Sequence, residues 1–474
     1  HKLLSYKLDS VAEHFINDNV RDINVVDNEQ HILIDGANTL IEGNFITFKY
    51  KNSDKKQDYV GTKFKIKNIG TNDDNTNWVI LDKYINPEIL FDNTKTEDNV
   101  EWQLAKDDVS PKQIFEFQKQ NSEKRCIIAT YCIQDCALCL TIINKLDLLT
   151  CNISMANVCC VPLSFIFLRG QGIKILSLVS KECKNEGFLL PVLRIENQEK
   201  ERKIKKQMRI EMKNLKFTPN YETSVDNYDG YEGAIVLHPK PAIYTKPIPV
   251  LDYSSLYPSS MISENISHDS YATDEEWLGD EGKKRLSDLG YNVNDITYDI
   301  FQWIDPNIKS KGKKITGKKT CRFVERKDGT KHLIPRILMK LLKARKDTRV
   351  KLKNETNAFM KGVYDGLQLA FKQTGNSLYG GVGSLTSAIS NVDLAACTTA
   401  TGRKLLFLAK SKVESHFEGA EIIYGDTDSI FINFNPKDKD GIPLEGREAL
   451  VKSIELGIEA EKYIQTFLKK PHVL

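Results

Sequence analysis

Residues 424–429 read Tyr-Gly-Asp-Thr-Asp-Ser and lie between two short apolar runs. The apolar runs are typical of two buried strands, and Gly-Asp-Thr-Asp is typical of the tight turn that joins the strands of a hairpin. Such a hairpin presents Asp426 and Asp428 together at its tip, where two partly buried carboxylates are costly unless a cation binds them. A divalent cation that prefers oxygen ligands would satisfy the pair. A solvated Asp-rich turn accounts for this short segment equally well.

The composition limits the class of protein. A chain of 474 residues is too long for one hydrophobic core, so we expect about two to four domains. With 41% hydrophobic and 28% charged residues it is typical of a soluble globular protein, and no apolar run approaches the length of a membrane span. The net charge of +3 is weak evidence for a polyanionic partner. Basic runs at 202–213 and 309–319 can line a phosphate backbone or form solvated loops.

The cysteines lack the paired Cys-x-x-Cys spacing of a zinc site. Cys132, Cys136 and Cys139 fall on one face of a helix, interleaved with Leu and Ile, which predicts a buried thiol stripe. The chain does not start with a signal peptide. We therefore expect ten free thiols in a reducing, intracellular compartment.

A further carboxylate, Asp252, follows the apolar strand at 248–251. Asp252 and Asp428, on separate strands, can share two hard metal ions. In phosphoryl transfer one such ion activates the attacking oxygen and the other stabilises the leaving group. Because Mg²⁺ keeps few protein ligands, few carboxylates are needed. Taken alone, Asp252 is better explained as an ordinary strand-end cap.

Residues 335–380 have the periodicity of a helical hairpin. Lys372, Asn376 and Tyr379 lie on one stripe of its second helix, at i, i+4 and i+7. A cation, an amide and an aromatic ring on one face suit a nucleotide, although on spacing alone a solvated helix face is the better explanation. If the helices are antiparallel, Arg345 of the first helix adds a second cation toward one triphosphate.

Three segments in this order resemble the polymerase motifs of B-family DNA polymerases: residues 252–259, 372–380 and 424–429. The Tyr-Glu-Gly-Ala segment at 231–234 resembles the family's segment between the proofreading and polymerising sites, and the Tyr and Asp at 131 and 135 resemble its third exonuclease motif. The resemblance runs from about residue 125 to the end. It is closest to delta-like enzymes of large nucleocytoplasmic DNA viruses, mimivirus-like ones in particular.

The resemblance implies a role for each matched residue. Asp252 and Asp428 would be catalytic and would bind two Mg²⁺ ions, with Mn²⁺ as a substitute, and Asp426 would be a secondary carboxylate. At the incoming nucleotide, Tyr257 would be the gate against a 2′-hydroxyl, and backbone amides near Ser255 and Leu256 would bind the triphosphate together with the cations Arg345 and Lys372. Asn376 and Tyr379 would lie around the nascent base pair, and Tyr231 and Gly233 would contact the DNA. Tyr131 and Asp135 would belong to a partial exonuclease site.

The resemblance also implies an α+β multidomain fold, with a polymerase palm of antiparallel sheet and helices, helical-hairpin fingers, and the C-terminal part of an RNase H-like 3′–5′ exonuclease domain before them. Asp27 and Glu29 form the only early Asp-x-Glu, and we interpret them as ordinary loop residues. We expect a fragment without the exonuclease N-terminus or the thumb, inactive by itself. The expected parts are exonuclease at 1–155 with a β-rich insertion at about 25–105, a helical connection and basic linker at 156–230, palm at 231–334 with an insertion at about 266–330, fingers at 335–380, and palm at 381–474.

The implied function is template-directed DNA synthesis in viral replication, with a primer 3′-hydroxyl attacking the α-phosphate of a deoxynucleoside triphosphate. Expected partners are primer–template DNA, deoxynucleoside triphosphates and a sliding clamp, with no membrane, in the host nucleus or a cytoplasmic viral factory. One alternative is a non-catalytic DNA-binding or scaffolding relative, but such relatives usually lose the metal carboxylates that are kept here. Another is a nucleotidyl transferase or cyclase with a similar two-carboxylate palm, which leaves the segment at 372–380 unexplained.

Overall fold

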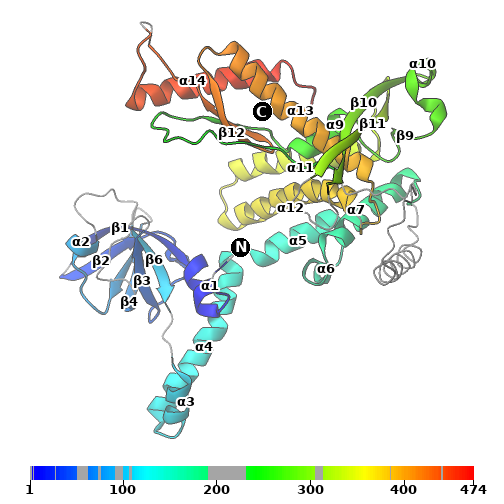
Figure 1. Ribbon diagram of the computed structural model, residues 1–474. Helices are drawn as coiled ribbons and strands as arrows, with labels where there is room; N and C mark the ends of the chain where they lie inside the picture. Colours follow the sequence, from blue (N-terminus) through cyan, green and yellow to red (C-terminus); the bar gives the residue numbers. More distant parts are fainter. Residues whose placement is uncertain are drawn as a thin grey trace, which may run out of the picture. The chain divides into compact units, whose positions relative to one another are not determined.

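The computed structural model describes residue 3 and residues 5–26, 28–50, 62–72, 76–90, 100–105, 109–190, 231–304, 313–384, 386–438 and 441–474. Asp27, the basic run at 202–213 and the expected linker at 195–230 lie outside the described residues. The chain divides into two compact units, His1–Thr150 and Cys151–Leu474, and each is described by itself (Figure 1).

A closed barrel, with the strand order β1-β2-β5-β4-β3-β6, forms most of the first unit. Its side chains alternate between the inside and the outside, so that Val100, Trp102 and Leu104 of the last strand are all buried. The Trp102 indole N–H donates to the Asp35 carbonyl at 2.9 Å. The β-rich stretch was expected from about residue 25, whereas the barrel already begins at Asn17. The strands are β1 (Asn17–Val26), β2 (Glu29–Ile34), β3 (Phe45–Tyr50), β4 (Phe64–Thr71), β5 (Asn77–Leu81) and β6 (Val100–Ala105).

The helices of this unit are α1 (Leu8–Phe15), a 3-10 turn (Ala37–Thr39), α2 (Pro87–Leu90), α3 (Pro111–Gln118) and α4 (Ser122–Lys145). Along α4, Leu138 and Ile142 pack against the barrel core. Cys132, Cys136 and Cys139 lie on another face of the helix and are exposed. The prediction of a buried thiol stripe is therefore wrong, because helical spacing identifies a face but not the face that the rest of the fold covers.

Helix α4 also corrects the expectation about membrane spans. Among the described residues it is the one helix long and apolar enough to cross a membrane by length and composition. Only 6% of its apolar window is buried inside the structure, and a single helix that passes this test assigns no membrane to the chain.

The second unit contains a four-stranded antiparallel sheet in the order β7-β12-β13-β8. Two long helices, α13 (Val392–His416) and α14 (Gly446–Gln465), pack on this sheet through a shared apolar core that includes Leu406, Ile430 and Ile464. The strands are β7 (Val236–Leu237), β8 (Val250–Asp252), β12 (Glu421–Asp426) and β13 (Ser429–Asn433).

A second sheet, in the order β10-β11-β9, is built from the stretch that was expected to be an insertion at about 266–330. Tyr298, Cys321 and Phe323 of its two long strands are buried in the largest core cluster of this unit. This stretch is therefore part of the hydrophobic core. Its elements are β9 (Tyr271–Ala272), a 3-10 turn (Glu275–Trp277), α10 (Gly279–Asp288), β10 (Tyr291–Trp303) and β11 (Lys313–Arg326).

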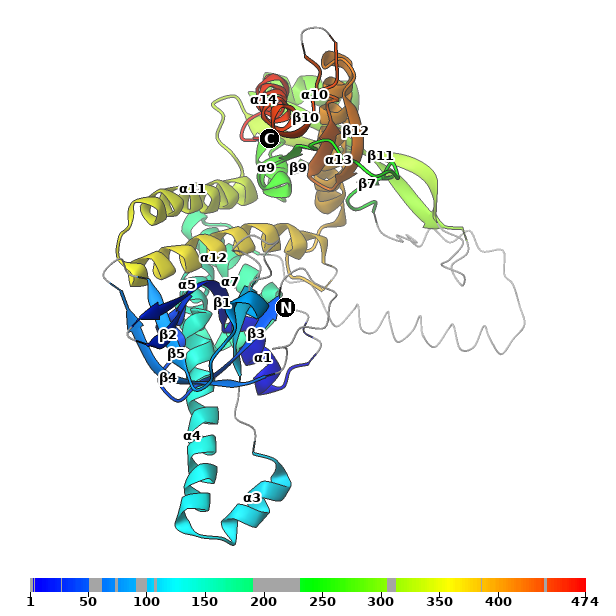
Figure 2. The same cartoon turned by 90° about the vertical axis from the view of Figure 1, so that its left-hand side faces the viewer.

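Helices α11 (Leu333–Asn354) and α12 (Ala358–Gly383) lie side by side as a hairpin in both views (Figures 1 and 2). The Asn357 side chain caps α12 by accepting from the Met360 N–H. Helix α9 (Leu256–Ser263) contacts both helices of the hairpin and α13. The remaining helices are α5 (Leu148–Cys159), which crosses the unit boundary, α6 (Leu163–Leu168) and α7 (Gln171–Glu186).

A network of hydrogen bonds joins the segment after α9 to the start of α11. The Asn265 carboxamide, fully buried, accepts from the His332 N–H at 3.0 Å and donates to the Val324 carbonyl at 2.6 Å. The next two N–H groups donate to the Asp269 carboxylate and to the Ser267 hydroxyl. Side chains of one short loop thus satisfy three successive N–H groups at a helix start, where no partner exists within the helix.

We expect Asn265→Ala to lower the free energy of unfolding by about 2–4 kcal/mol, because it leaves buried polar groups unpaired and puts alanine at φ +57°. Chemical denaturation measures the change, with Asn292→Ala, at an exposed position of β10, as the control, expected to shift stability by less than about 0.5 kcal/mol. Equal effects of the two substitutions would contradict a structural role for this hydrogen-bond network.

Candidate active site

The β12–β13 turn holds two carboxylates in a constrained backbone. Asp426 pairs with Ser429 across the hairpin, which leaves Thr427 and Asp428 as the turn residues. Thr427 has φ +57°, a costly conformation for a β-branched residue. Its N–H donates to the Ile235 carbonyl at 3.0 Å and its hydroxyl to the Asp426 carboxylate at 2.9 Å. These contacts hold the strained turn in one geometry.

The strand β8 brings Asp252 beside this turn. Asp252 pairs in register with Ser429 of β13, and the Tyr253 N–H donates to the Asp428 carbonyl at 2.8 Å. Partial burial, and next the nearby charge of Asp252, raise the pKa of Asp428 above its usual range. Asp252 is exposed and Asp428 is partly buried, and two neighbouring carboxylates form a donor set that suits a hard divalent cation.

A cleft of about 470 Å³ opens at these carboxylates. It is lined from three directions, by the end of β8 and the start of α9, by the β12–β13 turn, and by the α11–α12 hairpin. The structure thereby brings together nearly all residues that the sequence indicated for the polymerising site. The lining residues are Asp252, Tyr253, Ser254, Ser255, Leu256, Tyr257, Pro258, Arg345, Lys372, Asn376, Tyr379, Thr427 and Asp428.

Asp426 is the predicted carboxylate that the cleft does not include. It is exposed at the end of β12, although its charge contributes to the raised pKa of Asp428 after burial and Asp252. Within the described ranges, no three His, Cys, Asp or Glu side chains converge as a metal cluster. Two carboxylates, those of Asp252 and Asp428, therefore supply the acidic side of the cleft.

Cations of the helical hairpin face these carboxylates. The Lys372 ammonium is close enough to lower the pKa of Asp428, opposing the larger effects of burial and Asp252. Arg345 is half-buried, and its Nε donates to the Gln368 carboxamide at 3.4 Å. Burial, and then repulsion from Arg349, lower the pKa of Arg345. The site therefore holds separated positive and negative charges, as an anion bound through metal ions requires.

Three tyrosines form an aromatic wall beside the carboxylates. The rings of Tyr257 and Tyr379 lie 4.5 Å apart between centroids and are inclined by 32°. The hydroxyl groups of Tyr379 and Tyr231 are 3.4 Å apart. Desolvation is the largest cause of the raised pKa of both Tyr257 and Tyr379, so both phenols are neutral at ordinary pH. Ser255, at φ +52°, turns the chain into α9 directly before Tyr257.

Arg403 of α13 is a residue that sequence reasoning missed. Its guanidinium donates to the carbonyls of Glu232 and Gly233 at 2.6 and 2.8 Å and lies 3.2 Å from the Glu232 carboxylate. These bonds hold the predicted DNA-contacting segment, in which Tyr231 belongs to the aromatic wall and Gly233 is exposed. A lone arginine within a helix has no local pattern that would have singled it out.

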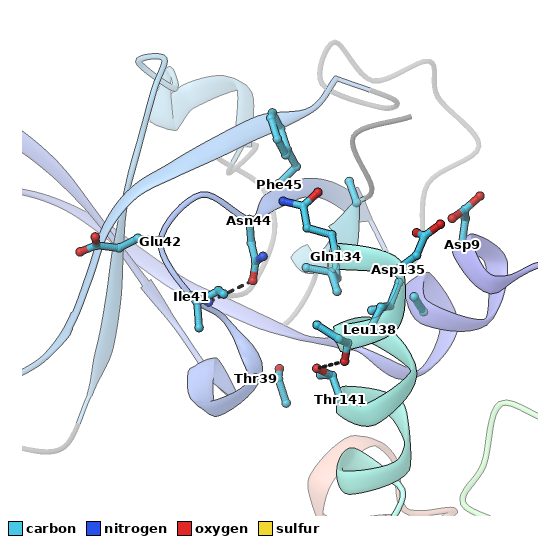
Figure 3. Close-up of a pocket in the computed structure, with 14 residues that line it drawn as sticks. Asp9, Thr39, Ile41, Glu42, Asn44, Phe45, Gln134, Asp135, Leu138 and Thr141 are labelled. Carbon is cyan, nitrogen blue, oxygen red and sulfur yellow. Dashed lines mark hydrogen bonds between the residues drawn. The ribbon is translucent and has the colours of Figure 1, made fainter. Parts of the chain in front are cut away.

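The predicted exonuclease residues lie in the first unit, on α4. Asp135 lines a cavity of about 170 Å³ together with Asp9 of α1 and Thr39, as Figure 3 shows. Tyr131, one turn earlier, is not among the residues that line this cavity. Glu29 is exposed at the start of β2, consistent with an ordinary residue.

Comparison with known proteins relates the chain that carries this site to a protein family. The model of DNA polymerase family B matches residues 161–466. The DNA polymerase of Pyramimonas orientalis virus is 39% identical, covering 100% of this chain and 37% of the relative. The DNA polymerase of Acanthamoeba polyphaga mimivirus is 28% identical over 69% of this chain and 27% of its own length.

The DNA polymerase delta catalytic subunit of Dictyostelium discoideum is 30% identical over 77% of this chain and 27% of its own length. The chain thus spans well under half the length of these relatives. The family match contains the Asp252–Asp428 pair, both helices of the hairpin and all three tyrosines of the aromatic wall. The chain therefore belongs to DNA polymerase family B, with viral and delta-type relatives.

Proposed function

We propose that this chain carries the site at which a template-directed DNA polymerase adds deoxynucleotides to a primer 3′-hydroxyl in viral DNA replication. The observation that carries the proposal is a single cleft in which Asp252 and Asp428 face Arg345 and Lys372. Opposed charges of this kind are what phosphoryl transfer mainly demands, because the transition state spreads negative charge over the transferred phosphoryl group.

Asp252 and Asp428 would hold two divalent cations, Mg²⁺ or Mn²⁺, with Asp426 as a secondary carboxylate. The crowding that raises the pKa of Asp428 supports this assignment, because a bound cation would relieve the repulsion. When bound, the ions would stabilise the attacking and leaving oxygens. The 3′-oxygen forms a bond to the α-phosphorus, the bond from that phosphorus to the bridging oxygen breaks, and pyrophosphate leaves.

The remaining cleft residues would bind and orient the nucleotide. Arg345 and Lys372 would neutralise the triphosphate, and the N–H groups at the start of α9, near Ser255 and Leu256, which no side-chain cap satisfies in the described part of the chain, suit a phosphate oxygen. Tyr257, fixed by its contact with Tyr379, would lie under the sugar and exclude a 2′-hydroxyl.

Asn376 and Tyr379 would shape the pocket around the nascent base pair, and Tyr231 and Gly233 would contact the primer–template DNA. These assignments rest on position. Asn376 and Tyr379 line the cleft, the Tyr231 hydroxyl contacts Tyr379, and the Gly233 carbonyl accepts from Arg403. A sliding clamp is a further proposed partner, on the likeness to delta-type relatives.

A proofreading role for Asp135 and Tyr131 is a separate proposal with less support. It needs further metal-binding carboxylates, and the described residues contain no cluster of three such groups. We also propose an intracellular location, in the host nucleus or a viral factory, which ten free cysteines favour. The scaffolding alternative conflicts with the retained Asp252–Asp428 pair.

In the full-length protein, Asp428→Asn should lower primer extension by about 10³-fold or more, because it removes a ligand of both cations. The Kd for primer–template should change by less than about threefold, since phosphate contacts dominate DNA affinity. Single-nucleotide incorporation and filter binding measure the two effects. Asp274→Asn, at an exposed carboxylate, is the control, and near-normal incorporation by Asp428→Asn would reject the two-metal proposal.

Tyr257→Ala should raise the ratio of ribonucleotide to deoxynucleotide incorporation by about 10- to 100-fold, because the ring that blocks the 2′-hydroxyl is gone. Tyr257→Phe keeps the ring and should leave the ratio unchanged. Competition assays with paired nucleotides measure it. The gate assignment fails if the alanine variant discriminates as well as the phenylalanine variant.

The raised pKa of Asp428 predicts a pH-dependent change in stability. A folded-state pKa above the unfolded value favours the protonated native form, so stability is lost as pH rises through the folded-state pKa. Asp428→Asn should therefore raise the Tm at pH 8 without metal, and the difference should vanish below about pH 4. Added Mg²⁺ should stabilise the wild type more than the variant. Thermal denaturation at several pH values measures the difference in Tm between the variant and the wild type. A variant Tm at pH 8 that is equal to or lower than that of the wild type would contradict the repulsion between Asp252 and Asp428.

A further inference from the structure

His472 is a buried histidine that does not line the cleft. It is 2% exposed, and its ring lies edge-on to the ring of Tyr253, with 6.4 Å between the centroids and 80° between the planes. Burial, and next repulsion from Lys469, lower the pKa of His472 to about 4, so the imidazole is neutral at ordinary pH. A neutral imidazole carries one N–H donor and one acceptor nitrogen.

One ring nitrogen of His472 has a hydrogen-bond partner and the other has none. Nε2 lies 3.1 Å from the hydroxyl oxygen of Ser263, the last residue of α9. Because that hydroxyl donates to the Ser260 carbonyl at 3.2 Å, it accepts from Nε2–H, which leaves the acceptor lone pair on Nδ1. Nδ1 is buried without a hydrogen-bond partner in the described part of the chain.

The unpaired nitrogen makes His472 a poor choice for stability alone. A buried polar atom without a partner is costly, and an apolar ring of similar shape would avoid that cost. The Ser263 hydroxyl would still donate to the Ser260 carbonyl without the imidazole. The bond between His472 and Ser263 therefore indicates a role other than stability.

The backbone of the same segment contacts the chain just after Asp252. The Val473 carbonyl accepts from the Ser254 N–H at 2.8 Å. The carboxamide of Gln465, the last residue of α14, donates to the His472 carbonyl at 2.8 Å. The segment is thus anchored to α14 and supports the end of the strand that carries Asp252.

His472 also holds the end of α9 that lies away from the proposed nucleotide site. The first residues of this helix, Leu256 and Tyr257, line the cleft, whereas Ser263 is its last residue. An eight-residue helix moves as a unit, because backbone hydrogen bonds link its successive turns. A bond at Ser263 therefore constrains the position of Tyr257.

We propose that His472 is a positioning residue for the proposed nucleotide site, which fixes the first residues of α9 relative to Asp252 through its bond to Ser263. The inference rests on the proposed function for the identity of that site. His472 acts through α9 and contacts no substrate. Its loss lowers the rate of the reaction, because small displacements of reacting and orienting groups are costly in catalysis.

The test compares His472→Phe with the wild type in the full-length protein. Phenylalanine keeps a ring beside Tyr253, loses the bond to Ser263 and removes the unpaired nitrogen. The Tm should therefore equal or exceed that of the wild type. The kcat for single-nucleotide incorporation should fall about tenfold, as expected for the loss of one hydrogen bond. The Kd for primer–template should stay unchanged.

Three further variants identify the bond as the cause. His472→Gln carries an amide that reaches toward Ser263, and it should recover about half or more of the lost kcat. Ser263→Ala removes the same bond from the other side, so the double variant with His472→Phe should lose no more than about tenfold. His416→Phe, at an exposed histidine of α13, is the matched control and should behave as the wild type does.

Hydrogen exchange measures the positioning without catalysis. In His472→Phe, the amides of residues 254–257 should exchange about tenfold faster than in the wild type and in His416→Phe, because the start of α9 is held less firmly. If the wild-type protein extends no primer, the proposed function fails, and the exchange rates still decide whether His472 holds α9.

Three results would overturn the proposal. The first is a kcat of His472→Phe that equals that of His416→Phe in an active protein. The second is unchanged exchange at residues 254–257. The third is a Tm of His472→Phe that falls together with kcat, which would make His472 an ordinary part of the core.

Discussion

Asp252 ends β8 and Asp428 precedes β13, and because these strands pair in register, two carboxylates repel each other inside a partly desolvated cleft. The turn between β12 and β13 has a strained backbone at Thr427, and backbone hydrogen bonds on both sides of the turn hold the carboxylates in place. Gly425 completes the arrangement, since a Cβ there would lie 2.9 Å from Leu237 and 3.1 Å from the Ser429 carbonyl. Strain and repulsion at one site are typical of a functional centre that a ligand completes.

The positive side of the cleft depends on a different contact. Arg345 and Lys372 belong to the α11–α12 hairpin, and the start of α11 is tied to the loop after α9 by Asn265 and Asp269. The same loop follows the helix that carries Tyr257. This hydrogen-bonded network therefore connects α11, which carries Arg345, to the loop that follows α9, which carries Tyr257, although the two segments are far apart in the sequence.

The sequence singled out most of the residues that line the cleft, because their signals are local. An acidic turn between apolar runs, a carboxylate after a strand, and a helical stripe at i, i+4 and i+7 can each be recognised within a few residues. The structure brings these segments to one cleft, with Asp426 alone at its edge.

What the sequence could not predict depends on non-local packing. The barrel order β1-β2-β5-β4-β3-β6 joins strands that are distant along the chain. The thiol face of α4 was assigned to the inside, although Leu138 and Ile142 meet the core instead. Arg403 and Asn265 carry their roles through partners at least 59 residues away, so nothing beside them in the chain marks them.

The central claim is that Asp252 and Asp428 together bind divalent cations at the nucleotide site. The most direct measurement is an anomalous-difference map from crystals of the full-length protein with primer–template, Mn²⁺ and a non-hydrolysable deoxynucleoside triphosphate analogue. The account predicts manganese peaks bridged by both carboxylates and the triphosphate oxygens. Manganese bound elsewhere, or a triphosphate held by Arg345 and Lys372 with no metal at Asp252 and Asp428, would contradict it.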